Sequence, residues 1–292
     1  MGVILSLTRR NAKIYLRDKS SVFFSLLSVL IIIALYALFL AEIQVDSLRS
    51  MVGDIDGIRF LVDSWIMSGI LIVNTVTVTL GVLGNMIDDD AHGRLNGFLV
   101  TPIKRRHIVW GYLLSSWFVG IAISLIAFVL SEVYIVVSGG SPLPGPAIIE
   151  VVGLIVVNVL SASSMLFFIM TFVRTVGGFG ALSTILGTMI GFLTGIYMPV
   201  GILPKGVQTV IRCVPFSYSA ALMRQIFTRE PLSQVFAGAP EEAVREYILT
   251  FGIKMTIAGY EVKPLMTVAI VAGTGLIFFG LSALRMRLRR AK

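Results

Sequence analysis

The sequence predicts an all-α integral membrane protein with six transmembrane helices. Hydrophobic residues make up 56% of the 292 positions and charged residues only 14%, with a mean hydropathy of +0.92. Soluble domains carry about a quarter charged residues. Six apolar runs each approach the ~20 residues that a helix needs to cross the hydrocarbon core. Little of the chain is left for a soluble domain, so we expect one transmembrane domain over residues 1–292.

The charge distribution favours a membrane protein over a nucleic-acid-binding protein. The formal net charge is +8, but the basic residues gather at the ends of apolar runs, as the positive-inside rule describes. The chain has one cysteine, Cys213, which excludes an internal disulfide and a multi-cysteine metal site. We therefore expect membrane lipid around this chain, no nucleic-acid partner and no bound metal.

The first two elements form the entry into the membrane. Residues 1–20 mix apolar with basic side chains, which is typical of a helix lying in the membrane interface. A basic flank that merely orients the first span is the alternative. The apolar run 21–41 follows about twenty mixed residues and is long enough to span, so we expect a transmembrane helix rather than a cleaved signal peptide.

Five further spans follow along the chain. An acidic connector leads into the second span. A link with three prolines and three glycines, SGGSPLPGPA, predicts a tight turn after the third span. The predicted spans two to six are residues 62–84, 108–137, 147–173, 177–200 and 264–284.

Counting the basic residues gives an orientation. With both termini in the cytoplasm, fifteen of the 24 Lys and Arg residues lie inside and nine lie outside. Residues 206–228 are apolar enough for a seventh span, but Arg212, Pro215 and Arg224 interrupt them, and a seventh crossing would move the basic tail outside. We therefore predict a re-entrant element over 201–228, because irregular backbone at membrane depth must be surrounded by protein.

Residues 229–262 are predicted to form an extracellular loop. This loop contains a stretch that is expected to be an amphipathic helix, with Glu241, Glu242, Arg245 and Glu246 on its polar side. It is the longest polar segment of the chain.

The loop 85–107 after the second span is unusually structured for a connection. Three acids are expected at the start of a short helix, where the helix dipole favours negative charge. Apolar residues at i, i+3 and i+4 would form one face, Pro102 would end the helix, and a basic cluster at 104–106 would anchor the third span. The acids are Asp88, Asp89 and Asp90, and the apolar residues are Leu95, Phe98 and Leu99. The helix could rest on lipid or dock a cytoplasmic partner.

Two motifs resemble a known family. The order of acid, glycine and leucine, then TPI and a basic cluster, resembles the segment after the second span in type-2 ABC transporter permeases. YMPVGILPKG (197–206) and VPFSYSAALMR (214–224) resemble the re-entrant region of the same family. One departure is that the family usually has a glutamate before the glycine, where this chain has aspartates. The resemblance implies a re-entrant exit gate that contains Pro199, Pro204, Pro215, Phe216, Tyr218 and Arg224.

The resemblance also implies an ATPase partner. In this family the loop helix is a coupling helix that docks into a groove of a separate ATPase subunit. Leu95, Phe98 and Leu99 would fill the groove, with the three acids and Arg94 on its rim. The chain contains no G-x-x-x-x-G-K-[ST] motif, so two ATPase subunits are expected to bind the ATP and Mg²⁺. This chain itself is expected to be no enzyme and to hold no cofactor.

A stripe of small residues marks the fifth span. Gly187, Gly191 and Gly195 are spaced by four, which permits close helix approach. Packing inside one subunit and a dimer interface are both compatible with this spacing. The resemblance favours the interface, because spans one and five of the family meet their dimer mates. It implies a homodimer, or a heterodimer with a paralogous permease, in a prokaryotic plasma membrane.

Polar residues within the spans are few. Asn74, Asn158 and the serines near 161–164 could form helix–helix hydrogen bonds or line a substrate path. Intramembrane charges, which ion-coupled transporters use, are scarce, and His92 and His107 form no HExxH motif. We therefore expect an exporter of an amphipathic drug, lipid, peptide or glycolipid. An ion-coupled secondary transporter or channel is the alternative, and a membrane-embedded hydrolase is a third possibility.

Overall fold

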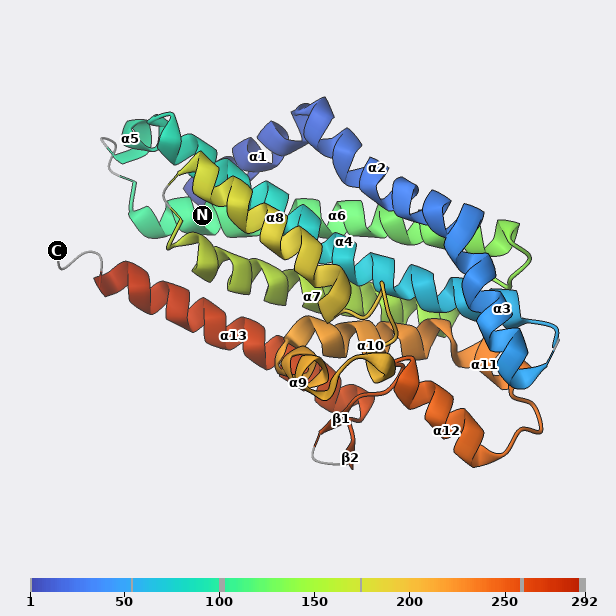
Figure 1. Cartoon of the computed structure of the whole chain (residues 1–292). Coiled ribbons are helices and arrows are strands. Elements are labelled where there is room, and N and C mark those ends of the chain that lie inside the picture. Colours follow the sequence, from blue (N-terminus) through green and yellow to red (C-terminus); the bar gives the residue numbers. More distant parts are fainter. Residues whose placement is uncertain (1, 54, 100–102, 174, 258–259, 289–292) are drawn as a thin grey trace.

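The computed structural model describes residues 2–53, 55–99, 103–173, 175–257 and 260–288, and these form an all-helical bundle with one short hairpin (Figure 1). The elements are α1 Gly2–Arg17, α2 Lys19–Leu35, the π-helix Tyr36–Leu40, α3 Ala41–Val52, α4 Ile58–Ala91, α5 Arg94–Leu99, α6 Arg105–Val137, α7 Gly145–Met170, α8 Val176–Leu193, the 3₁₀ turn Val200–Ile202, α9 Lys205–Cys213, α10 Pro215–Phe227, α11 Arg229–Val235, α12 Glu241–Thr250, β1 Thr256–Ile257, β2 Tyr260–Glu261 and α13 Pro264–Leu288.

Six helices in the described part of the chain are long and apolar enough to cross a membrane, as predicted. They are Lys19–Phe39, Ile58–Ala91, Arg106–Val137, Gly145–Met170, Val176–Leu193 and Pro264–Arg285. Helix α10 is not among them. Its 13 residues reach about 20 Å at 1.5 Å per residue, which is short of the ~30 Å hydrocarbon core. The prediction of six spans rather than seven is confirmed for these residues.

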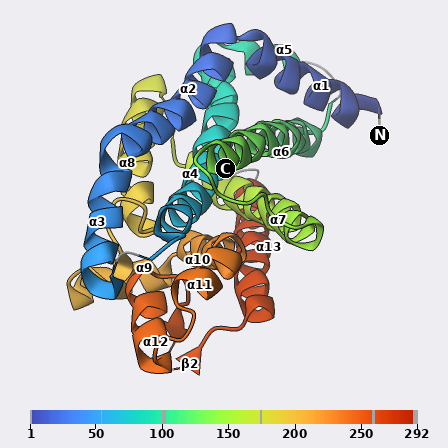
Figure 2. The same cartoon turned by 90° about the vertical axis from the view of Figure 1, so that its right-hand side faces the viewer.

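Helix α4 is the centre of the bundle. It packs against α6, α7, α8 and α10 and is buried along most of its length (Figure 2). Its 34 residues extend over about 51 Å, well beyond the thickness of the hydrocarbon core. Helix α4 is therefore long enough to cross the hydrocarbon core and to extend beyond it.

Close contacts and hydrogen bonds join α4, α6 and α7. A Cβ atom added at Gly120 would lie 2.9 Å from Val159, so α6 and α7 approach as closely as a glycine allows. Asn158 donates a hydrogen bond to the Thr75 hydroxyl, and Ser116 donates to the Ser163 hydroxyl at 3.0 Å. These polar residues therefore serve helix–helix contacts.

Helix α5, α1 and the C-terminal end of α13 lie toward one end of the bundle, and α11 and α12 lie toward the other, with the β-hairpin at the lower edge (Figure 1). These ends are called the α5 end and the α12 end below. In the hairpin, Thr256 pairs with Glu261 and Ile257 with Tyr260. The helix expected over the acidic part of the 229–262 segment is confirmed as α12.

Candidate functional site

The α5 end is organised around the carboxylate of Asp89, which is only 1% exposed. Arg10 of α1 donates two hydrogen bonds to it, one of them at 3.1 Å. Arg94 of α5 donates at 2.6 Å and Tyr112 of α6 at 2.5 Å. One side chain at the end of α4 thus joins four helices.

A second carboxylate extends this network toward the surface. Asp88 accepts a hydrogen bond from the Arg94 guanidinium and lies 3.1 Å from His92 Nδ1. The hydrogen bonds to Asp89 hold the pKa values of Arg10 and Arg94 above their ordinary range. Both guanidinium groups are therefore charged at any physiological pH, and the junction stays ion-paired.

The acids do not begin the short helix, and this part of the prediction is wrong. Asp88, Asp89 and Asp90 form the last turn of α4, the chain turns at Gly93 with φ of 69°, and α5 starts at Arg94. Carboxylates at a helix C-terminus are unfavourable on their own. Here the arginines of α1 and α5 supply the compensating positive charge.

The apolar face of α5 is turned partly toward its own chain. Leu95 and Phe98 are half-buried and pack on a cluster of Leu7, Ile108 and Tyr112. The Arg10 guanidinium lies 5.3 Å from the centre of the Phe98 ring. The Leu99 side chain and Pro102 lie outside the described residues. Gly97 of α5, by contrast, is exposed and has open space around it.

The three glycines of the fifth span have different surroundings. A Cβ atom added at Gly187 would meet nothing within 4 Å, whereas one at Gly191 would lie 2.3 Å from the ring of Tyr197. Gly195 has φ of 70° and lies beyond the end of α8. Only Gly187 faces open space, and Gly191 is covered by its own chain.

The residues of the predicted exit gate are mostly buried inside this chain. Phe216 and Tyr218 are 4% and 5% exposed, and the Tyr218 hydroxyl donates to the Arg212 carbonyl at 2.8 Å. The three prolines start short elements, since Pro199 precedes the 3₁₀ turn, Pro204 precedes α9 and Pro215 is the first residue of α10. Phe216 and Tyr218 therefore pack inside the chain and stabilise α10.

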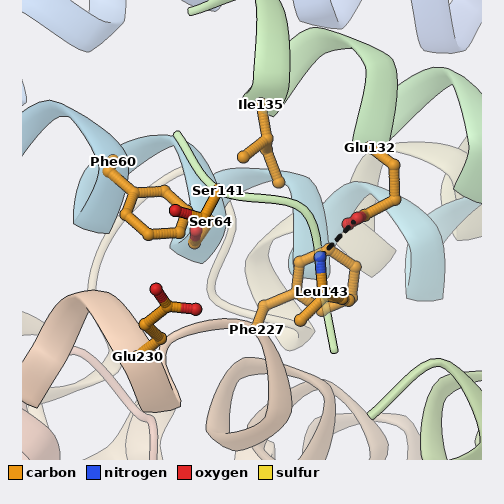
Figure 3. A pocket seen from close by; sticks show the side chains of 8 residues that line it. All are labelled: Phe60, Ser64, Glu132, Ile135, Ser141, Leu143, Phe227 and Glu230. Carbon is orange, nitrogen blue, oxygen red and sulfur yellow. Dashed lines mark hydrogen bonds between the residues drawn. The ribbon is translucent and has the colours of Figure 1, made fainter. Parts of the chain in front are cut away.

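A small cavity lies between α4, α6, α10, α11 and the turn after α6 (Figure 3). Glu132 accepts a hydrogen bond from the Leu143 backbone N–H at 3.0 Å, and the Ser64 hydroxyl next to the cavity has no protein partner. The cavity has room for about one water molecule, far below the ~300 Å³ of a drug-sized site. This cavity is not a substrate chamber.

Sequence reasoning missed Arg10 and Tyr112 as parts of the site. Arg10 counted only as one charge of a basic flank, and Tyr112 as one aromatic residue of the third span. A pair separated by 79 positions, such as Arg10 and Asp89, has no signal in a single sequence. The sequence shows only that acids end the second span and that the N-terminal helix is basic, which is a hint that the two could pair.

Six candidate spans, a basic N-terminal helix packed on them and an ion-paired helix between spans two and three define a multi-pass membrane protein. The ABC-2 type transporter family model matches residues 3–228, and the chain belongs to this family. The matched domain is the membrane permease of such transporters and has no ATPase activity, so family membership implies an ATPase partner. No curated protein matches the chain significantly.

Proposed function

We propose that this chain is the transmembrane subunit of an ATP-driven exporter. Two such subunits, identical or paralogous, would assemble with two ATPase subunits that bind ATP and Mg²⁺. The cargo would be an amphipathic drug, lipid, peptide or glycolipid, because the spans offer apolar and hydroxyl side chains with few charges. It would enter from the cytoplasm or inner leaflet and leave through the α12 end.

Helix α5 is the proposed coupling helix, and the Asp89 network is the observation that supports this role most directly. The network ties the short α5 to α1, α4 and α6 through buried, charge-assisted hydrogen bonds. When the ATPases close on ATP, they would push α5. Because α5 is ion-paired to the end of the most central helix, the push would move α4 and the helices packed on it.

The α5 end also supports the proposed orientation in the membrane. Helix α5, α1 and the C-terminal end of α13 lie toward the same end (Figure 1), and this end carries the basic cluster of α1, which suits the cytoplasmic side. The α12 end would face outward, with α9 and α10 as a re-entrant element that returns from the end of α8. We place the protein in a prokaryotic plasma membrane.

The cargo path is proposed to run between two subunits. The spans of α2 and α8 are the least buried of the six, since only 18% and 11% of their most apolar stretch is buried inside the described chain. The cavity of Figure 3 is too small for such a cargo. A second copy packed on α2 and α8 would instead enclose a path between the two subunits. Gly187 lies on the open face of α8 and would allow close approach of the mate.

The docking of α5 can be tested with Gly97→Trp. This exposed glycine has nothing within 4 Å, so a large side chain would block a partner without disturbing the fold. Gly153→Trp is the matched control, because Gly153 is also an exposed helical glycine with open space, but on the lipid-facing side of α7. The C-terminally tagged chain is solubilised mildly, and the copurifying ATPase is quantified by mass spectrometry.

We expect Gly97→Trp to lose the ATPase and ATP-driven transport while it inserts normally. Gly153→Trp should retain both. Full ATPase recovery with Gly97→Trp would contradict docking at α5, and the absence of any ATPase with the wild-type chain in several mild detergents would contradict the exporter function.

A further inference from the structure

We propose that Arg224 is a clasp that holds the C-terminal end of α8 to the α12 end of the molecule, and that its release from Gly252 opens the outer gate. The inference rests on the proposed function for the direction of transport. The clasp itself rests on the contacts of one buried side chain.

Arg224 of α10 joins three separate parts of the chain. It is 1% exposed, and its guanidinium donates to the Thr194 carbonyl at 2.7 Å and to the Gly252 carbonyl at 3.4 Å. Its other side lies over the ring of Trp65, 4.6 Å from the ring centre. The end of α8, the segment after α12 and the central helix α4 thus meet at one cation.

The positive charge is balanced by a helix end. Among the described residues, none forms a salt bridge with Arg224. Helix α8 ends at Leu193, and the last carbonyls of a helix carry partial negative charge and need donors. Arg224 serves Thr194, Ser217 donates to the Leu193 carbonyl at 2.6 Å, and Tyr36 donates to the Ile196 carbonyl at 2.7 Å. The end of α8 is therefore capped by side chains from other helices.

Glycines surround the guanidinium closely. A Cβ atom added at Gly69, Gly195 or Gly252 would lie 3.5, 3.4 or 3.3 Å from the nearest guanidinium nitrogen of Arg224. Gly195 and Gly252 also have φ of 70° and 61°, which L side chains rarely adopt. The absence of side chains at these positions leaves a narrow space that fits a flat guanidinium. A lysine would not reproduce the hydrogen bonds to both carbonyls.

The clasp ties α10 more firmly to one side than to the other. Two hydrogen bonds join α10 to the end of α8, from Arg224 to the Thr194 carbonyl and from Ser217 to the Leu193 carbonyl, whereas Arg224 makes one to the Gly252 carbonyl. We therefore expect α8 and α10 to move together, and the segment after α12 to part from them. Val200 lies in this junction, because Cβ atoms at Gly195 and Gly252 would both contact its side chain.

A cysteine at residue 200 can report the opening. Cys213→Ser removes the single cysteine, and Val200→Cys then places one thiol at a site that is 8% exposed. The labelling rate with a membrane-impermeant maleimide, added from outside, is compared between this background, Arg224→Gln and Arg212→Gln. Arg212 is the matched control because it is an exposed arginine at the end of α9.

We expect Arg224→Gln to label about tenfold faster or more, because charged hydrogen bonds are lost, and Arg212→Gln to label like the background. Arg224→Lys keeps the charge but cannot make both hydrogen bonds at once, so it should also accelerate labelling if Arg224→Gln fails to fold. Unchanged labelling in the folded variants would overturn the clasp.

A second arm tests the gate in the working transporter. When the copurified ATPase is given ATP, Mg²⁺ and vanadate, so that ADP and vanadate stay trapped after hydrolysis, the background thiol at residue 200 should label faster than without nucleotide. Unchanged labelling here, together with fast labelling in Arg224→Gln, would overturn the gating role and leave a structural contact. The first arm needs no ATPase, so a failure of the proposed exporter function is distinguished by the absence of a partner.

Discussion

The substitution Asp89→Asn tests the junction of four helices at the α5 end. It keeps the size of the side chain and removes its charge. The carboxylate accepts hydrogen bonds from Arg10, Arg94 and Tyr112, of which only Tyr112 is buried. Loss of hydrogen bonds to charged groups costs about 1.5–3 kcal/mol each, and the Arg10 side chain is 30% exposed, which reduces its share through solvent screening. We expect about 3 kcal/mol of local destabilisation in total.

The assay is hydrogen–deuterium exchange of the purified chain, read by mass spectrometry on peptides from α1 and α5. A loss of about 3 kcal/mol corresponds to roughly 100-fold faster local exchange. Asp90→Asn is the matched control, because Asp90 is the exposed neighbour of Asp89, and it should leave exchange unchanged. Native protection of α1 and α5 in Asp89→Asn would refute the argument that this carboxylate joins the helices.

Two further predictions concern helix contacts. Gly187→Trp should weaken dimerisation, measured by light scattering in detergent, whereas Gly191→Ala should leave the dimer intact and shift the Tyr197 ring inside one subunit; a normal dimer with Gly187→Trp would contradict the interface on α8. Gly120→Leu should lower the unfolding free energy by about 1–3 kcal/mol through overpacking against Val159, and thermal unfolding in detergent measures this; an unchanged midpoint would show that α6 and α7 can separate freely.

The spans could be predicted because a membrane leaves the backbone few choices. Each crossing needs about 20 apolar residues that satisfy their own hydrogen bonds, and hydropathy therefore located all six. The ends were less certain. Helix α8 was expected to reach residue 200 but ends at Leu193, because Gly195 takes a positive φ and Pro199 restarts the chain.

The candidate site was predictable by composition but not by geometry. Asp89 and Arg94 were both named from the sequence, yet the acids were placed at the wrong helix end, since the local dipole rule ignored an arginine 79 residues away. Arg224 was named as part of a gate motif. Its partners are backbone carbonyls, which every residue has, so the sequence cannot show which ones it binds.

The separation of Arg10 from Asp89 has a consequence for how the protein is made. Helix α1 leaves the ribosome before α4, and the buried carboxylate partner of Arg10 follows 79 residues later. At ~5–20 residues per second this interval lasts roughly 4–16 s. During that time α1 has only its exposed apolar and basic side chains, among them Leu5 and Leu16, with which to rest on the membrane surface. Helix α6, on which Leu7 of α1 packs, follows later still, so the N-terminal helix can be fixed to the bundle only once α4 is complete and α6 has been made.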